Sequence, residues 1–140
     1  MNINSISIVL FGSTFGLMLR LLILNNLKIN TGFNIQNTSI VNFLASFLLG
    51  ILVALNINNN NLLLFFFTGF LGCFSTFSSF IYQLFVLLQQ RKLIRLFFHY
   101  IEIIFLSFFC FYLGYYLMQL IKWKYKTAYI LFLLVMLRLF

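Results

Sequence analysis

The stretch GFLGCFSTFSSF, residues 69–80, decides how this chain folds. It lies inside an apolar segment, residues 62–88, that is otherwise typical of one membrane-spanning helix. Its two glycines weaken that helix, and the hydroxyl groups that follow can hydrogen-bond back to the backbone and bend it. Non-helical backbone at membrane depth is tolerated only where protein buries it or where it lines a wet cavity. The stretch therefore predicts a helix that is broken mid-membrane, with freed carbonyl groups that need a donor, a water molecule or a cation.

The composition indicates an integral membrane protein. Of the 140 residues, 64% are apolar, 21% are aromatic and only 7% are charged, whereas about 25% of the residues in soluble domains are charged. A water-soluble fold would lack the polar surface to cover itself, so we expect nearly the whole chain to lie in the bilayer. The net charge of +8 comes from sparse basic residues at expected helix ends and loops. That distribution is typical of a membrane interface and excludes a clustered nucleic-acid-binding surface.

Three further segments are long and apolar enough to span a bilayer, which takes about 20 residues. They are residues 6–24, 38–55 and 97–121. Because no basic region precedes the first of them, we expect it to remain in the mature protein as a helix rather than act as a signal peptide. Together with the interrupted third segment, they predict an all-α membrane protein with four transmembrane helices, which form one domain over residues 1–121.

The remaining residues, 122–140, are expected to form a separate interfacial tail. They begin with KWKYK, residues 122–126, and this mixture of aromatic and basic side chains is typical of an anchor at the membrane surface. The apolar stretch that follows, residues 128–137, is too short to span a bilayer comfortably. We expect it to lie on the membrane or along the helix bundle.

Small and polar residues recur along one face of three of the segments. These stripes are Gly12, Gly16 and Arg20; Thr38, Asn42, Ser46 and Gly50; and Ser107, Cys110 and Gly114. Residues three and four apart share a helix face, small residues let a second helix approach closely, and polar groups at membrane depth need partners. The aligned stripes predict a pore or an interface between subunits, and they argue against a purely structural helix bundle.

Two residues of these stripes each leave two interpretations open. Arg20 would cost roughly 2.5–3.5 kcal/mol at the centre of a membrane helix, so it either extends toward the nearby helix end or faces an anion path or a partner subunit. Asn42 carries an amide with two N–H donors. It either joins neighbouring helices by hydrogen bonds or lines the pore.

The chain has few groups for acid–base or metal chemistry. Glu102 is its one acidic residue, His99 its one histidine, and Cys73 and Cys110 lie far apart in the sequence. A membrane enzyme would need paired carboxylates, a metal cluster or an activated nucleophile, so we expect no enzyme. His99 and Glu102 are expected to pair with each other or with loop arginines, or else to handle protons. The alternative function is therefore a small dual-topology, proton-coupled exporter of the multidrug type that uses Glu102.

The basic residues outside the helices do not favour one orientation in the membrane. With a cytoplasmic N-terminus, the outer loops would carry Lys28, Arg91, Lys92 and Arg95, and the inner tail would carry Lys122, Lys124 and Lys126. This near balance gives no orientation under the positive-inside rule, so we expect the chain to insert both ways. Because four short helices rarely enclose a pathway alone, we predict an antiparallel dual-topology dimer.

The interrupted stretch resembles the GxxGGxTTFSTF signature of the CrcB/Fluc family of fluoride channels. Residues 11–20, FGSTFGLMLR, are similar to that family's glycine-rich first helix, and residues 39–50, SIVNFLASFLLG, are similar to its VNxxGSFxxG second helix. The resemblance covers residues 6–121. It implies a fluoride-selective ion channel that passively exports fluoride across the plasma membrane. It also implies a multi-pass protein that forms an antiparallel homodimer with two narrow pores, and pairing with a homologous subunit stays open.

The same resemblance implies which residues serve the ion. The fluoride path would be formed by Asn42, Phe77, Phe80, Ser78, Thr76, Ser107 and Arg20. A structural sodium ion (Na+) at the dimer centre would be held by the backbone carbonyl groups of Gly72 and Ser75 from both subunits. Cys73 departs from the signature, because it replaces the second glycine of a pair. If that position needs a backbone conformation that only glycine adopts, the break would be strained.

The chemistry of these residue types suits a small anion. A pore for tightly hydrated fluoride must replace water with hydrogen-bond donors, which asparagine amides and serine or threonine hydroxyl groups supply. An aromatic ring has a positive edge, so Phe77 and Phe80 can face an anion without binding it too tightly for conduction. The alternative is that both are core residues among the 21 phenylalanines.

Overall fold

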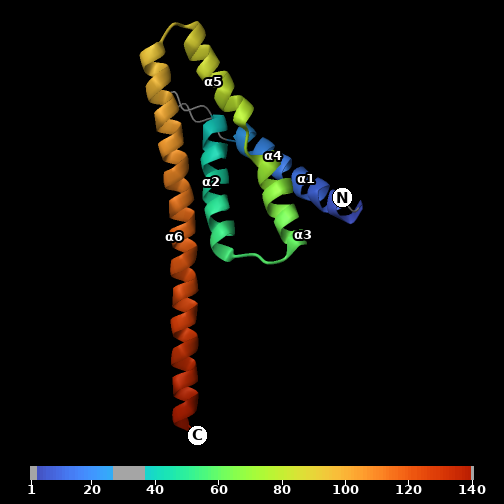
Figure 1. Ribbon diagram of the computed structural model, residues 1–140, viewed down its shortest axis with the longest axis vertical. Helices are drawn as coiled ribbons and strands as arrows, with labels where there is room; N and C mark the ends of the chain where they lie inside the picture. The colour runs from blue at the N-terminus through green and yellow to red at the C-terminus, as the bar shows by residue number, and fades with distance from the viewer. Residues whose placement is uncertain (1–2, 27–36, 140) are drawn as a thin grey trace.

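The computed structural model describes residues 3–26 and 37–139, and within these ranges all regular secondary structure is helical (Figure 1). The elements are α1 (Ile3–Asn26), α2 (Asn37–Leu55), α3 (Asn60–Leu63), η1 (Leu64–Leu71), α4 (Gly72–Phe74), α5 (Phe77–Gln89) and α6 (Leu93–Leu139). An apolar chain without water must satisfy its backbone groups internally, and a helix does so within one segment.

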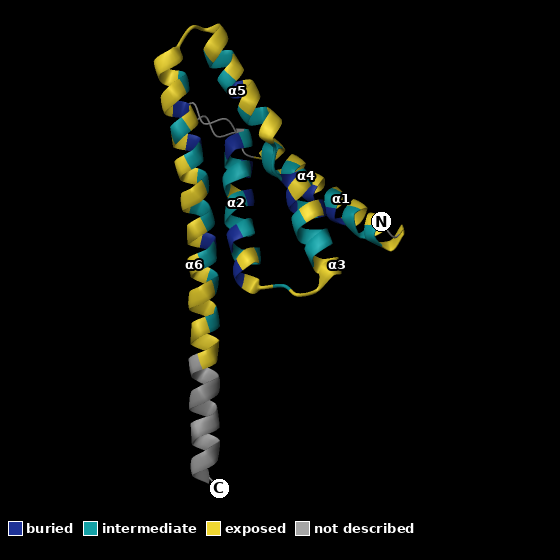
Figure 2. Ribbon diagram, in the orientation of Figure 1, coloured by how far each residue is buried: buried dark blue, intermediate teal, exposed yellow. Residues whose placement is uncertain are grey.

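Four helical segments of the described residues are long and apolar enough to cross a membrane. They are Ile3–Asn26, Thr38–Leu55, Asn60–Gln89 and Leu93–Lys126, which confirms the four predicted spans and the multi-pass membrane protein. Most of their large apolar side chains point outward, as expected where lipid is the solvent. Figure 2 shows the buried positions on the faces where helices meet and the exposed positions on the outer faces.

The third segment is assembled from α3, η1, α4 and α5, and it is bent by 25°. The π-helical η1 is followed by the single turn of α4, after which Ser75 (φ −82°, ψ 156°) and Thr76 (φ −139°, ψ 119°) have extended backbone. The hydroxyl of Ser75 donates to the carbonyl of Leu71 at 2.9 Å, so one of the expected back-bonding hydroxyls lies at the bend. The structure thus shows a bent third segment, and a break of this helix at mid-membrane depth stays a prediction.

Glycines allow two close helix crossings. A Cβ atom added to Gly12 on α1 would overlap the carbonyl oxygen of Phe65 on η1, and one added to Gly69 would lie 2.6 Å from the carbonyl oxygen of Val9. A Cβ atom added to Gly50 on α2 or to Gly114 on α6 would likewise overlap a backbone carbonyl of the facing helix. The glycines of the stripes thus pack helices within one chain, α1 on the third segment and α2 on α6.

The buried core is small and lies where α2 meets the third segment. Val41, Ala45, Leu71 and Phe74 form it, and Phe74 is fully buried. α6 continues past the other helices as one helix (Figure 1), so residue 121, where the separate tail was expected to begin, is not a helix end. The interfacial location of residues 122–140 stays a prediction.

Candidate functional site

A pocket of about 720 Å³ lies between α2, the third segment and α6. Its lining includes many of the residues singled out in the sequence, namely Asn42, Gly72, Ser75, Thr76, Phe77, Phe80 and Ser107. The rest of the lining is largely apolar, with leucine, isoleucine and phenylalanine side chains. Sites that bind small ligands usually have this form, which is a concave and mostly apolar surface with a few polar groups.

Asn42 binds the backbone at the bend. Its Nδ2 donates to the carbonyl of Thr76 at 2.9 Å, and its Oδ1 accepts from the N–H of Thr76 at 2.8 Å. These two bonds satisfy both polar backbone groups of a residue whose extended conformation removes it from the helical pattern. Asn42 therefore joins neighbouring helices, as one of the two interpretations of the sequence expected, and it also lines the pocket. Only one of its two amide N–H groups is used in this pair, and its role in a pore stays a prediction.

The hydroxyl groups near the bend have different surroundings. Ser75 donates to Leu71, as described above, and the hydroxyl of Thr76 donates to the hydroxyl of Ser79 at 3.1 Å. Ser107 on α6 is half-buried and lines the pocket from the opposite side. Ser78 is exposed and does not belong to the lining, so the structure does not bring it together with the others.

Two phenylalanines begin α5 at the pocket. Phe77 is 75% exposed, and its ring centroid lies 6.1 Å from that of Phe80 with a tilt of 54°. Phe80 in turn stacks on Tyr100 of α6, with a centroid distance of 6.0 Å and an angle of 28°. Tyr100 was missed in the sequence, where nothing distinguishes it among seven tyrosines.

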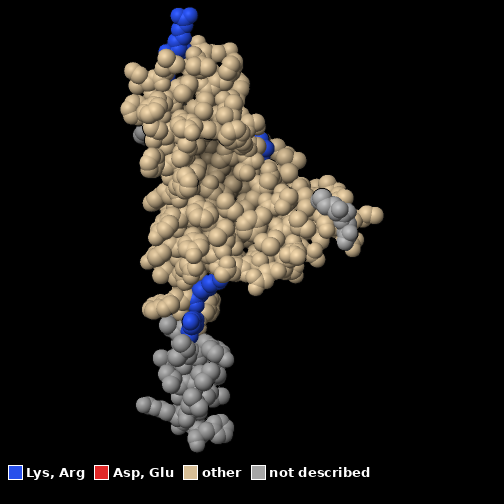
Figure 3. Space-filling model, viewed as in Figure 1, with Lys and Arg blue, Asp and Glu red and all other residues tan. Residues whose placement is uncertain are grey.

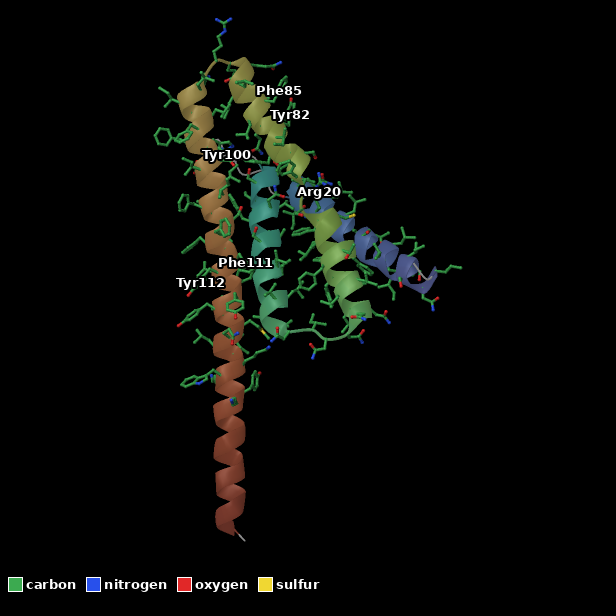
Figure 4. All side chains as sticks on the ribbon, in the orientation of Figure 1. Arg20, Tyr82, Phe85, Tyr100, Phe111 and Tyr112 are labelled. Carbon is green, nitrogen blue, oxygen red and sulfur yellow. The ribbon has the colours of Figure 1, made fainter. Side chains whose placement is uncertain are left out.

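Arg20 lies apart from the pocket. It is half-buried on α1 (Figure 4), the helix that packs against η1 and α4, and it is not part of the lining. The visible face of the molecule carries little charge: Figure 3 shows basic groups at its ends and one on its flank. The structure therefore joins most, but not all, of the residues expected along one path.

His99 contacts a residue that the sequence did not single out. Its Nε2 lies 3.1 Å from Oε1 of Gln83, whereas Glu102 is exposed on α6. The expectation that His99 pairs with Glu102 or a loop arginine is therefore corrected, because a buried imidazole needs a buried partner. A glutamine inside the apolar segment, three residues after Phe80, was the signal that could have identified Gln83.

The backbone at Cys73 has an ordinary conformation. Among the described residues, a left-handed φ angle occurs only at Asn56 and Arg91, so Cys73 does not need a glycine-only conformation and causes no strain there. Gly72 is exposed and Ser75 has extended backbone, and both line the pocket. Carbonyl oxygens are suitable ligands for a hard cation. The described residues contain no cluster of three or more His, Cys, Asp or Glu side chains that would hold a metal ion instead.

Comparison with known proteins gives the family. A family model described as "CrcB-like protein, Camphor Resistance (CrcB)" matches residues 7–115. A Prochlorococcus marinus (strain MIT 9312) protein named "Fluoride-specific ion channel FluC 2" is 77% identical over 122 residues, which cover 87% of this chain and 100% of that protein.

More distant relatives carry related names. A protein of Prochlorococcus marinus subsp. pastoris, also named "Fluoride-specific ion channel FluC 2", is 51% identical over 117 residues, covering 84% of this chain and 95% of its own. A Campylobacter jejuni (strain 81-176) protein named "Fluoride-specific ion channel FluC" is 36% identical over 117 residues, covering 81% of this chain and 96% of its own. The family model and these relatives show that the chain belongs to the family of CrcB-like proteins.

Proposed function

We propose that this chain forms a fluoride-selective ion channel that passively exports fluoride across the plasma membrane and so lowers cytoplasmic fluoride. The observation that carries this proposal is one pocket that joins Asn42, Phe77, Phe80 and Ser107 in a chain whose relatives are named fluoride-specific ion channels. The names of these relatives describe ion channels, which supports a channel over an enzyme.

The pocket offers an anion several weak contacts in place of one strong one. The two bonds to Thr76 hold the amide of Asn42 in place, and its second N–H is available to replace water around fluoride. The tilted rings of Phe77 and Phe80 would contribute positive edges. Ser107 would add a hydroxyl donor from α6. Conduction requires contacts that an ion can leave as well as enter, and weak contacts in series meet that requirement.

A second copy, in the opposite orientation, would complete the path. In one chain Phe77 and Phe108 line the pocket yet are 75% and 71% exposed, so one side of the pocket is open to the surroundings. Lipid there would face polar groups such as Asn42 without satisfying them. An antiparallel partner would cover this side, and the balanced basic residues allow both orientations. A homologous subunit would serve in place of an identical one, which gives a heterodimer.

We propose that a structural sodium ion binds the backbone carbonyl groups near the bend of the third segment. The third segment would be broken at mid-membrane depth at Ser75 and Thr76, where the backbone is extended. The carbonyl groups of Gly72 and Ser75 from both subunits would hold Na+ at the dimer centre. A cation there supplies positive potential beside an anion path. The ordinary backbone at Cys73 supports this assignment.

Residues 122–140 are proposed to form an interfacial tail. The ammonium group of Lys122 donates to the carbonyl of Ala54 at the C-terminal end of α2, a position where a cation also complements the helix dipole. Trp123 and Tyr125, which follow it on α6, are 69% and 74% exposed. Aromatic and basic side chains at a helix end are typical of the membrane surface, so this point of α6 would mark the edge of the bilayer.

The proton-coupled exporter finds less support. Such an exporter needs a carboxylate on the substrate path, and Glu102 is exposed on α6 outside the pocket. An anionic group beside a fluoride path would also repel the ion. We therefore assign Glu102 no role in transport.

The deciding experiment is fluoride efflux from liposomes that contain the purified protein. A fluoride electrode measures release, an ionophore collapses the potassium gradient, and no proton gradient is imposed. We expect rapid fluoride release and no comparable release of chloride. No fluoride release from a folded, dimeric protein would contradict the proposal for the homodimer, and restoration by a co-expressed homologue would assign the function to a heterodimer.

A further inference from the structure

Gln83 is the centre of a buried hydrogen-bond network that joins three helices. It is 4% exposed and is the one buried residue of α5, every residue of which is described. Its Oε1 accepts from the hydroxyl of Ser39 at 3.2 Å and lies 3.1 Å from Nε2 of His99, and its Nε2 donates to the hydroxyl of Thr38 at 2.9 Å. The amide therefore ties α5 to α2 on one side and to α6 on the other.

The chemistry of the network defines the role of each member. A carbonyl oxygen only accepts hydrogen bonds, so His99 must donate through Nε2–H, in the same way as Ser39 donates through its hydroxyl. Both lone pairs of the Gln83 oxygen are then used. Ser39 is 3% and His99 is 8% exposed, and Thr38 is half-buried. A roll of α5 about its axis would therefore leave buried polar groups without partners.

The same faces of α5 and α6 meet a second time at Phe80. Phe80 precedes Gln83 by three residues, so both lie on one side of α5. Phe80 stacks on Tyr100, and Gln83 bonds to His99, the neighbouring residue of α6. A continuous helix would transmit its rotation from one turn to the next, but α5 begins directly after the extended residue Thr76. The rotation of α5 must therefore be set by contacts of its own.

We propose that Thr38, Ser39, Gln83 and His99 form a latch that fixes the rotation of α5 and thereby holds the ring of Phe80 against Tyr100 at the pocket. The four are positioning residues: none of them lines the pocket that contains Phe80. The inference rests on the proposed function for its effect on fluoride. Whether Gln83 fixes the position of the Phe80 ring does not depend on which ion the pocket conducts.

The first test compares two glutamines of α5. Gln83→Met keeps the length of the side chain and removes the amide, whereas Gln89→Met makes the same change at an exposed position at the end of the helix. In liposomes, Gln83→Met is expected to lower fluoride flux by at least about tenfold. The substitution leaves the polar groups of Thr38, Ser39 and His99 without their partner, so other rotations of α5 become favourable. Gln89→Met is expected to conduct as the unsubstituted protein does. Equal flux in both variants would overturn the latch.

A second measurement separates positioning from general destabilisation and from failure of the proposed function. With 4-fluorophenylalanine at residue 80, fluorine NMR reports the stacking of this ring on Tyr100 whether or not the protein conducts. We expect one resonance that shifts or broadens with Gln83→Met and stays in place with Gln89→Met. An unchanged resonance in a folded Gln83→Met protein would refute the inference and leave the channel proposal intact.

A conservative series covers the possibility that Gln83→Met does not fold. His99→Gln keeps an N–H donor for the Gln83 oxygen, and His99→Leu does not. We expect His99→Gln to retain the fluorine resonance and most of the flux, and His99→Leu to lose both. If His99→Gln loses the fluorine resonance and the flux as His99→Leu does, an N–H donor at residue 99 is not sufficient to hold Phe80. That result would refute the proposed latch.

Discussion

The side chain of Asn42 pairs with both polar backbone groups of Thr76, at 2.8 Å to the N–H and 2.9 Å to the carbonyl. A helix that is interrupted inside a membrane must give its unpaired backbone groups new partners, because lipid offers none. Here one amide from α2 supplies both a donor and an acceptor. Asn42, which was expected to serve the ion, thus stabilises the bend beside the pocket.

Asn42→Leu should therefore affect both folding and transport. The substitution leaves the N–H and the carbonyl of Thr76 without their partner, and we expect it to lower the free energy of unfolding by about 1–3 kcal/mol. Fluoride flux should fall with it. Chemical denaturation in detergent and liposome efflux measure the two effects. Asn58→Leu, at an exposed loop position, is the control and should change neither; an Asn42→Leu protein of normal stability would contradict the pairing.

Phe77→Ile and Phe80→Ile should each reduce fluoride flux by about tenfold or more while the protein stays folded. Isoleucine retains apolar bulk but has no positive ring edge, so the barrier for the ion rises. Phe105→Ile is the control, because Phe105 is 71% exposed on α6 and outside the pocket lining. Normal flux in both test variants would eliminate the role assigned to the ring edges.

Glu102→Gln should leave fluoride flux nearly unchanged. The carboxylate is exposed and does not line the pocket, so removing its charge alters neither the donors nor the rings along the path. The measurement is liposome efflux with and without an imposed proton gradient. A loss of flux, or transport that follows the proton gradient, would favour the proton-coupled exporter.

Gly50→Ala should destabilise the fold, whereas Gly72→Ala should not disturb the packing. At Gly50 an added Cβ atom overlaps the carbonyl oxygen of Phe111, and at Gly72 the nearest atom lies 4.0 Å away. An extra methyl group in a well-packed contact lowers the free energy of unfolding by about 1–3 kcal/mol, and denaturation in detergent measures the difference between the variants. Equal stability of the two variants would mean that α2 and α6 can move apart without a loss of unfolding free energy.

Replacement of sodium by a large organic cation should weaken the dimer. Removal of the proposed central ion would leave the carbonyl groups of Gly72 and Ser75 facing one another without a cation, and like dipoles repel. Thermal unfolding of the purified protein over a sodium titration measures the effect, with potassium as the control ion. A midpoint that is independent of sodium would argue against a structural sodium site.

The residues proposed for the site differ in how far the sequence could identify them. Phe77 and Phe80 stand out through their place beside the glycine–hydroxyl stretch, and Asn42 stands out in a stripe of small and polar residues. The structure brings all three to one pocket. Ser78 belongs to the same stretch and Arg20 to a similar stripe, yet both lie outside that lining. Periodicity tells which residues share a face of one helix, but it does not tell which face meets another helix.

Hydropathy and backbone preference are properties of neighbouring residues, so the sequence could predict four apolar spans and a break near Ser75. The structure shows the four spans and a third segment that is bent by 25°. The pairing of Asn42 with Thr76 and the bonds of Gln83 to Ser39 and His99 are seen only in the folded chain. These partners are far apart along the chain, and hydrogen bonds form only at about 3 Å. Whether two side chains come this close depends on how their helices cross. The crossings are set by close contacts at glycines, and a pattern of neighbouring residues does not predict them.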